Sequence, residues 1–321
     1  MKKTALITGI NGQDGSYLAE YLLSKDYNVF GTIKRNSVAE TQTARLDNVY
    51  SRIGLEYADM TDMSSLMKVM FWSKPDEIYH LAAQSHVQIS FVEPIYTFNA
   101  NAIGTANLLE AARMVCPIAK IYNAASSEMF GNQEDDDGFQ SERTKMEPVS
   151  PYACSKVFGY NLCKNYRYAY KMFISNGILF NHESPRRGTN FVTTKIVKGA
   201  CEILRKKKKE LRLGNLDSYR DWGHAKDYVK AMHLMLQQQS PNDFVIATGE
   251  THTVREVCEY VFSKLGMNYK DYVVIDNKYL RPQELSFLKG NTDKARNLLG
   301  WSPEFTFETL LDDLIAYWKE Q

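Results

Sequence analysis

Apolar and amphipathic segments alternate along the first half of the chain. Six apolar runs have the length of β-strands, and stretches of helical periodicity separate most of them; the runs cover residues 4–8, 27–33, 55–58, 77–83, 120–125 and 173–180. Strands that alternate with helices are joined by right-handed crossovers and pair in parallel. The pattern therefore predicts an α/β fold with a parallel sheet.

The second half of the chain shows a different pattern. Long helices are expected over residues 94–115 and 190–209, but beyond residue 211 the expected elements are short: strands 211–214 and 244–247, and helices 226–236, 253–265, 293–299 and 307–319. We divide the chain into a domain over residues 1–180 and a smaller α/β lobe over residues 181–321, from which some segments return to the first domain. A crevice between sheet and lobe is the natural place for a ligand.

Composition excludes several classes of protein. The 321 residues are 44% hydrophobic and 24% charged, as in soluble globular proteins, and the net charge of +1 gives no sign of nucleic-acid or anionic-membrane binding. No stretch approaches the length of a membrane span, and the apolar run near the N-terminus is too short for a signal peptide. The five cysteines are scattered without a Cys-x-x-Cys pair. We therefore expect reduced thiols, a cytoplasmic protein and no metal site.

A glycine-rich turn follows the first expected strand. Gly9, Gly12 and Gly15 separate strand 4–8 from a helical stretch over residues 16–23. In this context the first glycine allows a tight turn, the second lets the backbone approach a pyrophosphate, and the third lets helix pack against strand. The alternative is a glycine-rich turn without a ligand. The turn favours a dinucleotide site in a Rossmann-type doubly wound parallel sheet.

The end of the second expected strand bears on the choice of dinucleotide. Lys34, Arg35, Asn36 and Ser37 occupy the position where an enzyme that uses NAD usually carries an acidic residue for the adenosine ribose. Basic residues suit the 2′-phosphate of NADP, although two solvated charges would have the same sequence. We therefore expect NADP rather than NAD.

A tyrosine, a lysine and an acidic residue form the candidate chemistry. Tyr152 and Lys156 are four residues apart, which on a helix places both on one face, and the lysine charge would lower the pKa of the phenol. A tyrosine that ionises readily is a general base for an alcohol/carbonyl couple. Ser126 and Glu128 follow strand 120–125, at the edge of the sheet where ligands bind. The alternatives are an ordinary helix surface and a capping turn.

Other polar positions leave two interpretations open. Asp59 could accept a hydrogen bond from an adenine amino group or cap a helix. His86 could belong to a site or to a loop. Arg186 and Arg187 follow strand 173–180 and could hold phosphate groups. The acidic stretch 134–138 is expected to be a solvated loop, and the basic run 205–209 to complement a helix dipole.

Longer runs carry a more specific resemblance. They are Ala83-Gln84-Ser85-His86-Val87, residues 150–156, Asn181-His182-Glu183-Ser184-Pro185-Arg186-Arg187-Gly188 and residues 220–229. Together with the glycine turn, they make the chain similar, over nearly its whole length, to the extended short-chain dehydrogenase/reductase family that acts on nucleotide sugars. Within that family the chain most resembles the 4,6-dehydratases of GDP-sugars.

The resemblance implies an internal redox reaction on a GDP-sugar. Tyr152 would take the O4 proton while C4 passes hydride to NADP⁺, Glu128 would remove the C5 proton, water would leave from C6, and the hydride would return to C6. Lys156 would hold the nicotinamide ribose, and Ser126 would bind O4. GDP-mannose is the expected substrate and GDP-4-keto-6-deoxymannose the product; a GDP-mannoheptose or another GDP-sugar is the alternative. A nucleotide-sugar epimerase and a non-catalytic NADP-binding sensor are less favoured.

The resemblance also implies binding residues and partners. The first domain would bind NADP and the lobe mainly the GDP-sugar, and the chain would associate into dimers or tetramers through the loop over residues 35–45, with Arg45 reaching a neighbouring cofactor site. The expected cofactor contacts are Gly9, Asn11, Gly12, Gln13, Asp14, Gly15, Lys34, Arg35, Asn36, Ser37, Asp59, Met60, Leu81, Ala82, Ala83, Gln84, Ser85, Tyr96, Lys156, His182 and Arg187. The expected substrate contacts are Ser85, Ser126, Glu128, Tyr152, Asn181, Lys195, Arg220, Arg281 and Glu284.

Two departures from the family concern the active site. Ser126 stands where threonine is usual, which keeps the hydroxyl. Ser127 stands where the dehydratases of glucose nucleotides carry an aspartic acid, so the proton for the leaving water would come from elsewhere, with Glu128 as the candidate.

Overall fold

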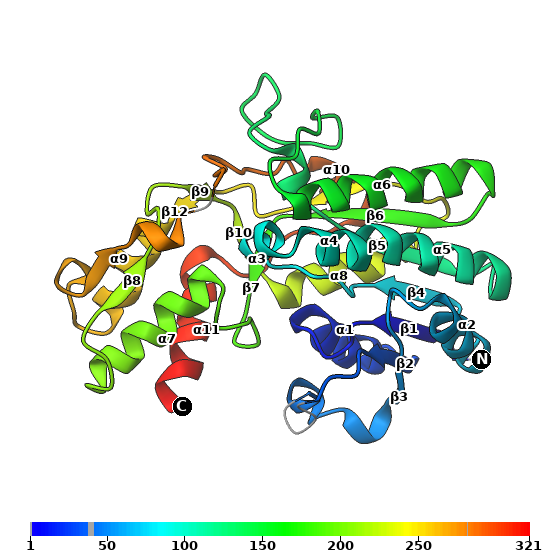
Figure 1. Ribbon diagram of the computed structural model, residues 1–321, viewed down its shortest axis with the longest axis horizontal. Helices are drawn as coiled ribbons and strands as arrows, with labels where there is room; N and C mark the ends of the chain where they lie inside the picture. The colour runs from blue at the N-terminus through cyan, green and yellow to red at the C-terminus, as the bar shows by residue number, and fades with distance from the viewer. Residues whose placement is uncertain (1, 38–41, 281) are drawn as a thin grey trace.

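A parallel sheet of seven strands organises the first domain. The computed structural model describes residues 2–37, 42–280 and 282–321. In spatial order, the strands of the sheet are β11 (Phe244–Ile246), β6 (Ile174–Leu179), β5 (Lys120–Ser126), β4 (Glu77–His80), β1 (Thr4–Thr8), β2 (Asn28–Ile33) and β3 (Gly54–Tyr57) (Figure 1). The order reverses at β1 and β4, so the expected doubly wound sheet is confirmed.

Helices cover both faces of this sheet, each with its own apolar core. On one face lie α1 (Gln13–Ser24), α8 (Ala225–Leu236) and α10 (Asp293–Leu299). On the other lie α2 (Met63–Ser73), α5 (Gly104–Val115) and α6 (Pro151–Ala169). Because neighbouring strands run parallel, the carboxyl ends of β1, β4, β5 and β6 lie at one edge of the sheet (Figure 1).

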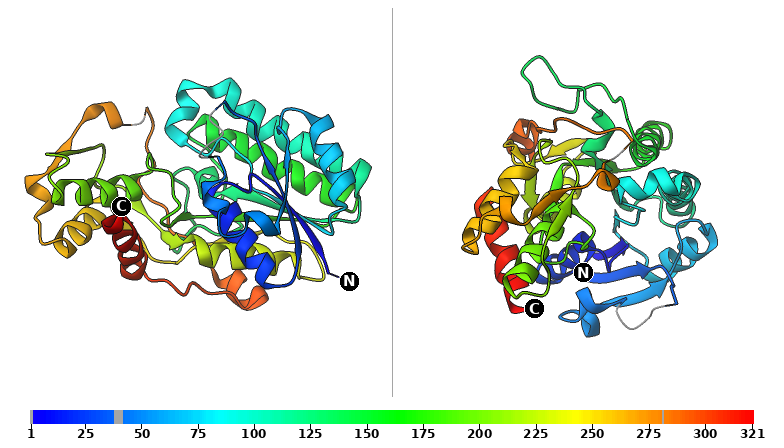
Figure 2. Two further views of the ribbon diagram at one scale, coloured as in Figure 1. Left: turned by 90° about the horizontal axis from the view of Figure 1, so that it is seen from below. Right: turned by 60° about the vertical axis from the view of Figure 1, so that its left-hand side comes forward.

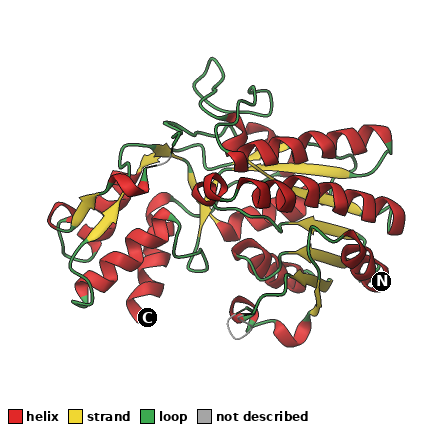
Figure 3. Cartoon of the chain, in the orientation of Figure 1, coloured by secondary structure: helices red, strands yellow, loops and turns green. Residues whose placement is uncertain are grey.

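The second lobe packs helices around its own core. It contains α7 (Val192–Leu204), α9 (Val254–Lys264) and α11 (Phe307–Glu320), and short strands lie among them (Figures 2 and 3). The strands pair as β8 (Leu211–Leu213) with β13 (Val273–Ile275), β9 (Tyr219–Arg220) with β12 (His252–Thr253), and β7 (Asn181–Glu183) with β10 (Trp222–His224). Three elements of the second half, α8, β11 and α10, pack against the large sheet.

Two expected elements differ from the structure. The helix over residues 94–115 is divided into α4 (Pro94–Phe98), a π-helical segment (Asn99–Ile103) and α5, and a further helix, α3 (Val87–Val92), precedes it. The strand over residues 77–83 ends at His80 because the next two backbone N–H groups donate to the Thr8 hydroxyl, at 3.1 and 3.2 Å, and leave the ladder.

The helix expected over residues 190–209 is also too long. α7 ends at Leu204, and Lys206 adopts a left-handed backbone conformation with φ +57°. A non-glycine residue in that conformation ends a helix. The basic run 205–209 therefore lies beyond the last helical residue, with Arg205 at the C-cap position.

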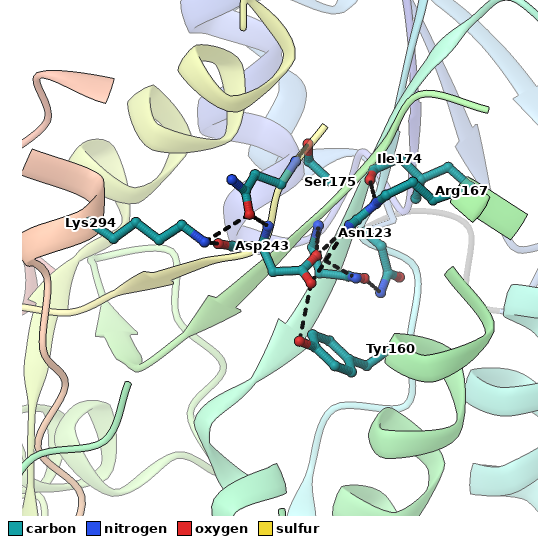
Figure 4. A network of polar contacts seen from close by, with 9 residues as sticks. Asn123, Tyr160, Arg167, Ile174, Ser175, Asp243 and Lys294 are labelled. Atoms are coloured by element: carbon teal, nitrogen blue, oxygen red, sulfur yellow. Dashed lines mark hydrogen bonds and ion pairs between the residues drawn. The ribbon is translucent and has the colours of Figure 1, made fainter. Parts of the chain in front are cut away.

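A buried polar network joins β11 to the neighbouring strand and to α6 (Figure 4). The Asp243 carboxylate accepts hydrogen bonds from the hydroxyl of Tyr160 at 3.1 Å, from the Asn176 amide at 2.9 Å and from the Arg167 guanidinium. Lys294, in α10, donates to the Asp243 carbonyl at 2.8 Å. A buried charge is tolerated when it is paired and hydrogen-bonded in this way. The network therefore fixes the returning segments to the first domain.

Two kinds of feature are absent from the described residues. None of the helices combines the length and apolar character needed to cross a bilayer. No group of three His, Cys, Asp or Glu side chains within these residues lies close enough to hold a metal ion.

Candidate active site

A cavity of about 830 Å³ lies where the carboxyl ends of the sheet strands face the second lobe. Every described residue expected to contact cofactor or substrate lines it, with the exception of Ser37. Arg281 lies outside the described residues. The cavity also has a lining that the sequence did not single out, which includes Gln88, Asn190, Phe191, Trp222 and Tyr279.

The glycine turn has the geometry that a dinucleotide requires. Gly9 has φ +69°, and a Cβ there would lie 2.9 Å from the Ala82 Cα. At Gly15 a Cβ would lie 2.5 Å from the Gly9 carbonyl oxygen, so both positions need glycine for packing. At Gly12 the single close protein neighbour of a Cβ would be the Gly9 carbonyl oxygen, at 3.2 Å. The side of Gly12 that is left open faces the cavity. The turn thus presents bare backbone and the N-terminus of α1, an arrangement that suits a pyrophosphate.

Basic residues at the end of β2 face the same cavity. Lys34 lies 3.0 Å from the Asp59 carboxylate and 3.4 Å from the Tyr96 hydroxyl, and Arg35 also lines the cavity. The alternative that Asp59 caps α2 is wrong, because Asp62 accepts hydrogen bonds from the first turn of that helix. Asp59 instead accepts from the N–H and hydroxyl of Thr61. The end of β2 therefore offers cations to a ligand, and the Asp59 carboxylate beside it is engaged by Lys34.

The structure brings together Ser126, Glu128 and Tyr152. Ser126 ends β5, and its hydroxyl accepts a hydrogen bond from the Glu128 N–H at 3.3 Å, as expected for a capping turn. Ser150 caps α6 by accepting from the Ala153 N–H at 3.1 Å, which sets Tyr152 in the first turn of that helix. All three side chains are buried and line the cavity. A hydroxyl, a carboxylate and a phenol are thus available to one ligand.

Burial dominates the acid–base properties of Tyr152 and Lys156. Burial raises the pKa of Tyr152 to about 12, against the lowering effect of a hydrogen bond with Ser126. Burial lowers the pKa of Lys156 to about 8. The Lys156 ammonium donates to the Ala124 carbonyl at 2.8 Å and lies 5.8 Å from the centre of the Tyr152 ring. The expected lowering of the Tyr152 pKa by Lys156 is therefore wrong for the chain alone, since the lysine is directed to the backbone and desolvation prevails.

Only one of the two adjacent arginines faces the cavity. Arg187 lines it, with its guanidinium 3.6 Å from the centre of the Phe191 ring and its Nε 3.3 Å from Glu183. Arg186 turns to α1, where it donates to Ser16 and pairs with Glu20. The prediction that both grip phosphates is therefore wrong for Arg186.

The lobe contributes cations and rings to the far side of the cavity. Lys195 lies 3.4 Å from the centre of the Tyr279 ring, and an Arg220 nitrogen lies 3.9 Å from the Glu284 carboxylate. Tyr279 ends a short 3-10 helix (Asn277–Tyr279) far from Lys195 in the chain, so the cation–π contact it makes could not be inferred from spacing. These groups suit a ligand with phosphate groups and a planar base.

Two further sequence interpretations concern His86 and Arg45. His86 fits both of its interpretations, because it lines the cavity and its Nδ1 accepts from the Ile89 N–H at the start of α3. Arg45 donates within its own chain, to the carbonyl groups of Asn11 at 3.2 Å and Arg186 at 2.9 Å. Its expected contact with a neighbouring copy stays a prediction, and part of the loop over residues 35–45 lies outside the described residues.

Comparison with known proteins places this site among enzymes. A family model described as GDP-mannose 4,6 dehydratase matches residues 6–314. The chain is 50% identical to "GDP-mannose 4,6 dehydratase 2" of Arabidopsis thaliana, over 98% of this chain and 86% of the relative. It is 48% identical to the Drosophila melanogaster and 44% identical to the Homo sapiens "GDP-mannose 4,6 dehydratase", over 98% of this chain and 85% and 91% of those proteins.

Solved structures share the fold. A dTDP-glucose 4,6-dehydratase from Streptomyces venezuelae, solved with NAD, has a TM-score of 0.87 at 23% identity and covers 99% of this chain and 97% of its own. A UDP-glucose 4-epimerase from Thermotoga maritima has a TM-score of 0.87 at 22% identity, with 99% of both chains covered. At this identity the likeness confirms the Rossmann-type architecture.

Proposed function

We propose that this chain, which belongs to the family of the GDP-mannose 4,6-dehydratases, converts GDP-mannose to GDP-4-keto-6-deoxymannose with loss of water. The observation that carries the proposal is the convergence of Ser126, Glu128 and Tyr152 at the end of β5, in the cavity that the glycine turn also lines. An internal redox dehydration needs a general base, a second proton acceptor and a site for a dinucleotide. Tyr152, Glu128 and the glycine turn would supply these in that order.

The cofactor proposed for this site is NADP. The bare backbone of the glycine turn would hold the pyrophosphate, and Lys34 and Arg35 would hold the 2′-phosphate, where a carboxylate would favour NAD. Lys156 would contact the nicotinamide ribose. When bound, the nicotinamide supplies reversible two-electron oxidation and reduction. Equilibrium titration with NADP⁺ and NAD⁺ tests this assignment, and a tighter affinity for NAD⁺ would contradict it.

Protons are moved by the side chains at the end of β5. Tyr152, as the phenolate, accepts the proton of the O4 hydroxyl, and Ser126 donates a hydrogen bond to that oxygen. Once C4 is a ketone, the hydrogen on C5 is acidic, and Glu128 accepts it. The C6 hydroxyl then leaves as water with a proton that Glu128 returns, since Ser127 has no acidic group to give. The C5=C6 double bond that remains would take the hydride back at C6 and, at C5, the proton that Tyr152 accepted from O4. Burial of all these groups keeps bulk water from the reacting atoms.

We assign the binding of the GDP part of the substrate to the second lobe. Lys195 and Arg220 would bind the diphosphate, with Asn181 and Glu284 as further contacts to the GDP-sugar. Arg281 is proposed for the same role from its sequence alone.

Mass spectrometry of the product tests the proposed function. The purified protein is incubated with GDP-mannose without added cofactor, and we expect the product to be lighter by one water. A matched incubation with GDP-mannoheptose separates the two candidate sugars, because reaction of the heptose alone would overturn the choice of GDP-mannose. No loss of water from either would contradict the dehydratase.

Self-association is proposed from an apolar surface beside the cavity. Val92, Ile95, Phe98, Ile103 and Phe158 are exposed on α3, α4, the π-helical segment and α6, with Val92 and Ile95 more than two-thirds exposed. An exposed apolar cluster of this kind is typical of a protein interface. Light scattering after size exclusion should give a dimer or larger assembly, and Ile95→Lys should reduce it; a monomer at micromolar concentration would contradict the proposal.

A further inference from the structure

His182 lies in β7 between two hydrogen-bond acceptors. Its Nδ1 lies 2.7 Å from the Phe180 carbonyl oxygen, and its Nε2 lies 2.8 Å from the Asp14 carboxylate. A neutral imidazole carries one N–H, so one of these contacts would then place a ring lone pair against an oxygen lone pair. Only the imidazolium donates to both. The contacts therefore fit an imidazolium beside an ionised Asp14, and the lowered pKa of Asp14 disfavours the alternative in which a protonated Asp14 donates to a neutral ring.

The surroundings of the ring support this charge state. The ring stacks on Tyr228 of α8, with centres 4.5 Å apart and planes at 24°, a contact that favours a cation. The charged groups that act on it are Asp14 of α1 and Arg187 of the loop after β7. Burial lowers the pKa of His182, but the charge and hydrogen bond of Asp14 outweigh burial and Arg187, so the net direction is upward. The pKa of Asp14 is correspondingly lowered, despite its burial.

The pair also acts on the reacting tyrosine. Asp14, His182 and Tyr152 line the same cavity. Burial is the main cause that raises the pKa of Tyr152, and the hydrogen bond of Ser126 lowers it; of the charged groups, Glu128 raises it, Arg187 lowers it and Asp14 raises it further. An uncompensated Asp14 would therefore make the phenolate harder to form. A positive His182 next to Asp14 reduces this effect, because opposite charges at contact distance cancel at longer range.

We propose that His182 is a positioning residue that is held as an imidazolium and shields Tyr152 from the charge of Asp14. The role of the pair rests on the proposed function, in which Tyr152 is the base. The same contact joins the turn after β1 to the second lobe, and Gln13 reinforces it by donating to the Asp14 carboxylate at 3.0 Å and to the His182 carbonyl at 3.1 Å.

The charge state can be read directly by nuclear magnetic resonance. In protein labelled with ¹⁵N-histidine, one ring with two protonated nitrogens should persist at pH 8 and disappear in His182→Gln. The chain has six histidines, and one of the others, His80, has its pKa lowered to about 3 by burial, so it should be neutral throughout. Absence of an imidazolium signal at pH 7 would overturn the proposal whether or not the protein is a dehydratase.

A double-mutant cycle tests the effect on Tyr152. His182→Gln keeps a donor toward Asp14 but removes the positive charge, so the acidic limb of the pH–kcat profile should move to higher pH by roughly half to one unit. Asp14→Asn removes the negative charge, and His182 then loses the partner that keeps it charged. Because both charges disappear together, the acidic limb of the pH–kcat profile of this variant should stay near the wild-type position. The double variant should restore the limb that His182→Gln displaced.

The cycle separates a charge effect from a structural one. If the contact only held the lobes together, each single variant and the double variant would lower kcat and Tm to a similar extent, and none of them would displace the profile. That outcome would overturn the proposal. Wild-type protein without dehydratase activity would instead contradict the proposed function, and the ¹⁵N spectrum would still decide the charge of His182. Equilibrium binding of GDP to each variant checks that the cavity is intact, because neither residue is among the expected substrate contacts.

Discussion

At the residue scale, the proposed reaction depends on the phenol of Tyr152. Tyr152→Phe removes the group that accepts the O4 proton but keeps the ring, so kcat should fall by a factor of about 10² to 10⁴ while NADP⁺ binding is nearly unchanged. Tyr168→Phe is the matched control, because Tyr168 lies on the same helix but is exposed and outside the cavity lining. Activity close to wild type in Tyr152→Phe would show that another group is the base.

Glu128 provides a second residue-level prediction. Glu128→Gln keeps the size of the side chain but cannot accept the C5 proton, so release of water should stop while oxidation at C4 can still proceed slowly. The reduced nicotinamide absorbs at about 340 nm, so absorbance at this wavelength should then rise on addition of GDP-mannose. Water loss at the wild-type rate would contradict the role of Glu128.

Residue types and strand ends were sufficient to predict much of the site. Ser126, Glu128, Tyr152 and the glycine turn were singled out because parallel strands deliver their carboxyl ends to one edge. The direction of a side chain is set by its packing, which sequence does not state. Arg186 therefore turned out to face α1, and Lys156 to donate to the Ala124 carbonyl. The pairing of His182 with Asp14 joins positions far apart in the chain and had no local signal.

At the element scale, α6 positions the base through its first turn. Ser150 caps this helix by accepting a hydrogen bond from the Ala153 N–H. Ser150 lies two residues before Tyr152 and Ala153 one residue after it, so this bond spans the tyrosine. Ser150→Ala should lower the free energy of unfolding by about 1 kcal/mol, measured by denaturant titration, and should also reduce kcat because the first turn frays. Ser150→Thr should recover both. Loss of stability without any change in kcat would contradict the link between this cap and the site.

Periodicity predicted the presence of elements better than their internal form. The apolar pattern of residues 94–115 is continuous, and the π-helical segment Asn99–Ile103 within it depends on tertiary bonds: the Asn101 side chain binds the backbone of Gln84 and the Ser155 hydroxyl. Such contacts pull a turn out of the α-helical register. The same reason explains β4, whose end is set by the Thr8 hydroxyl rather than by its own apolar run.

At the scale of the whole molecule, the buried network around Asp243 holds the returning segments in place (Figure 4). Asp243→Ala leaves Arg167 buried without its carboxylate, so the free energy of unfolding at pH 7 should fall by about 3–5 kcal/mol. Leu298→Ala, at an exposed position of α10, is a control that should change stability little.

The pH dependence of that loss has a defined sign. Burial alone would raise the pKa of Asp243, but Arg167 and the hydrogen bonds outweigh it and lower the pKa. A lowered pKa contributes stability above the unfolded value of about 3.9, and the contribution disappears as pH falls through the folded value. The difference between wild type and Asp243→Ala should therefore shrink in acid. A difference that is independent of pH would contradict the assigned ion pair.

Chain order alone did not reveal how the two halves interlock. A strand run over residues 244–247 was expected, but its place at the edge of the large sheet, beside β6, depends on long-range contacts such as that of Arg167 with Asp243. Short strands carry too little pattern to choose a partner.

The most direct test of the account follows the hydrogen on C4 of the sugar. GDP-mannose carrying deuterium at C4 is converted in ordinary water, and the product is examined by nuclear magnetic resonance. An internal redox dehydration predicts that the deuterium appears at C6 of the same molecule, with a ketone at C4 and one water lost. Loss of the deuterium to solvent, or its return to C4 in a product of unchanged mass, would contradict the proposed 4,6-dehydration by internal hydride transfer.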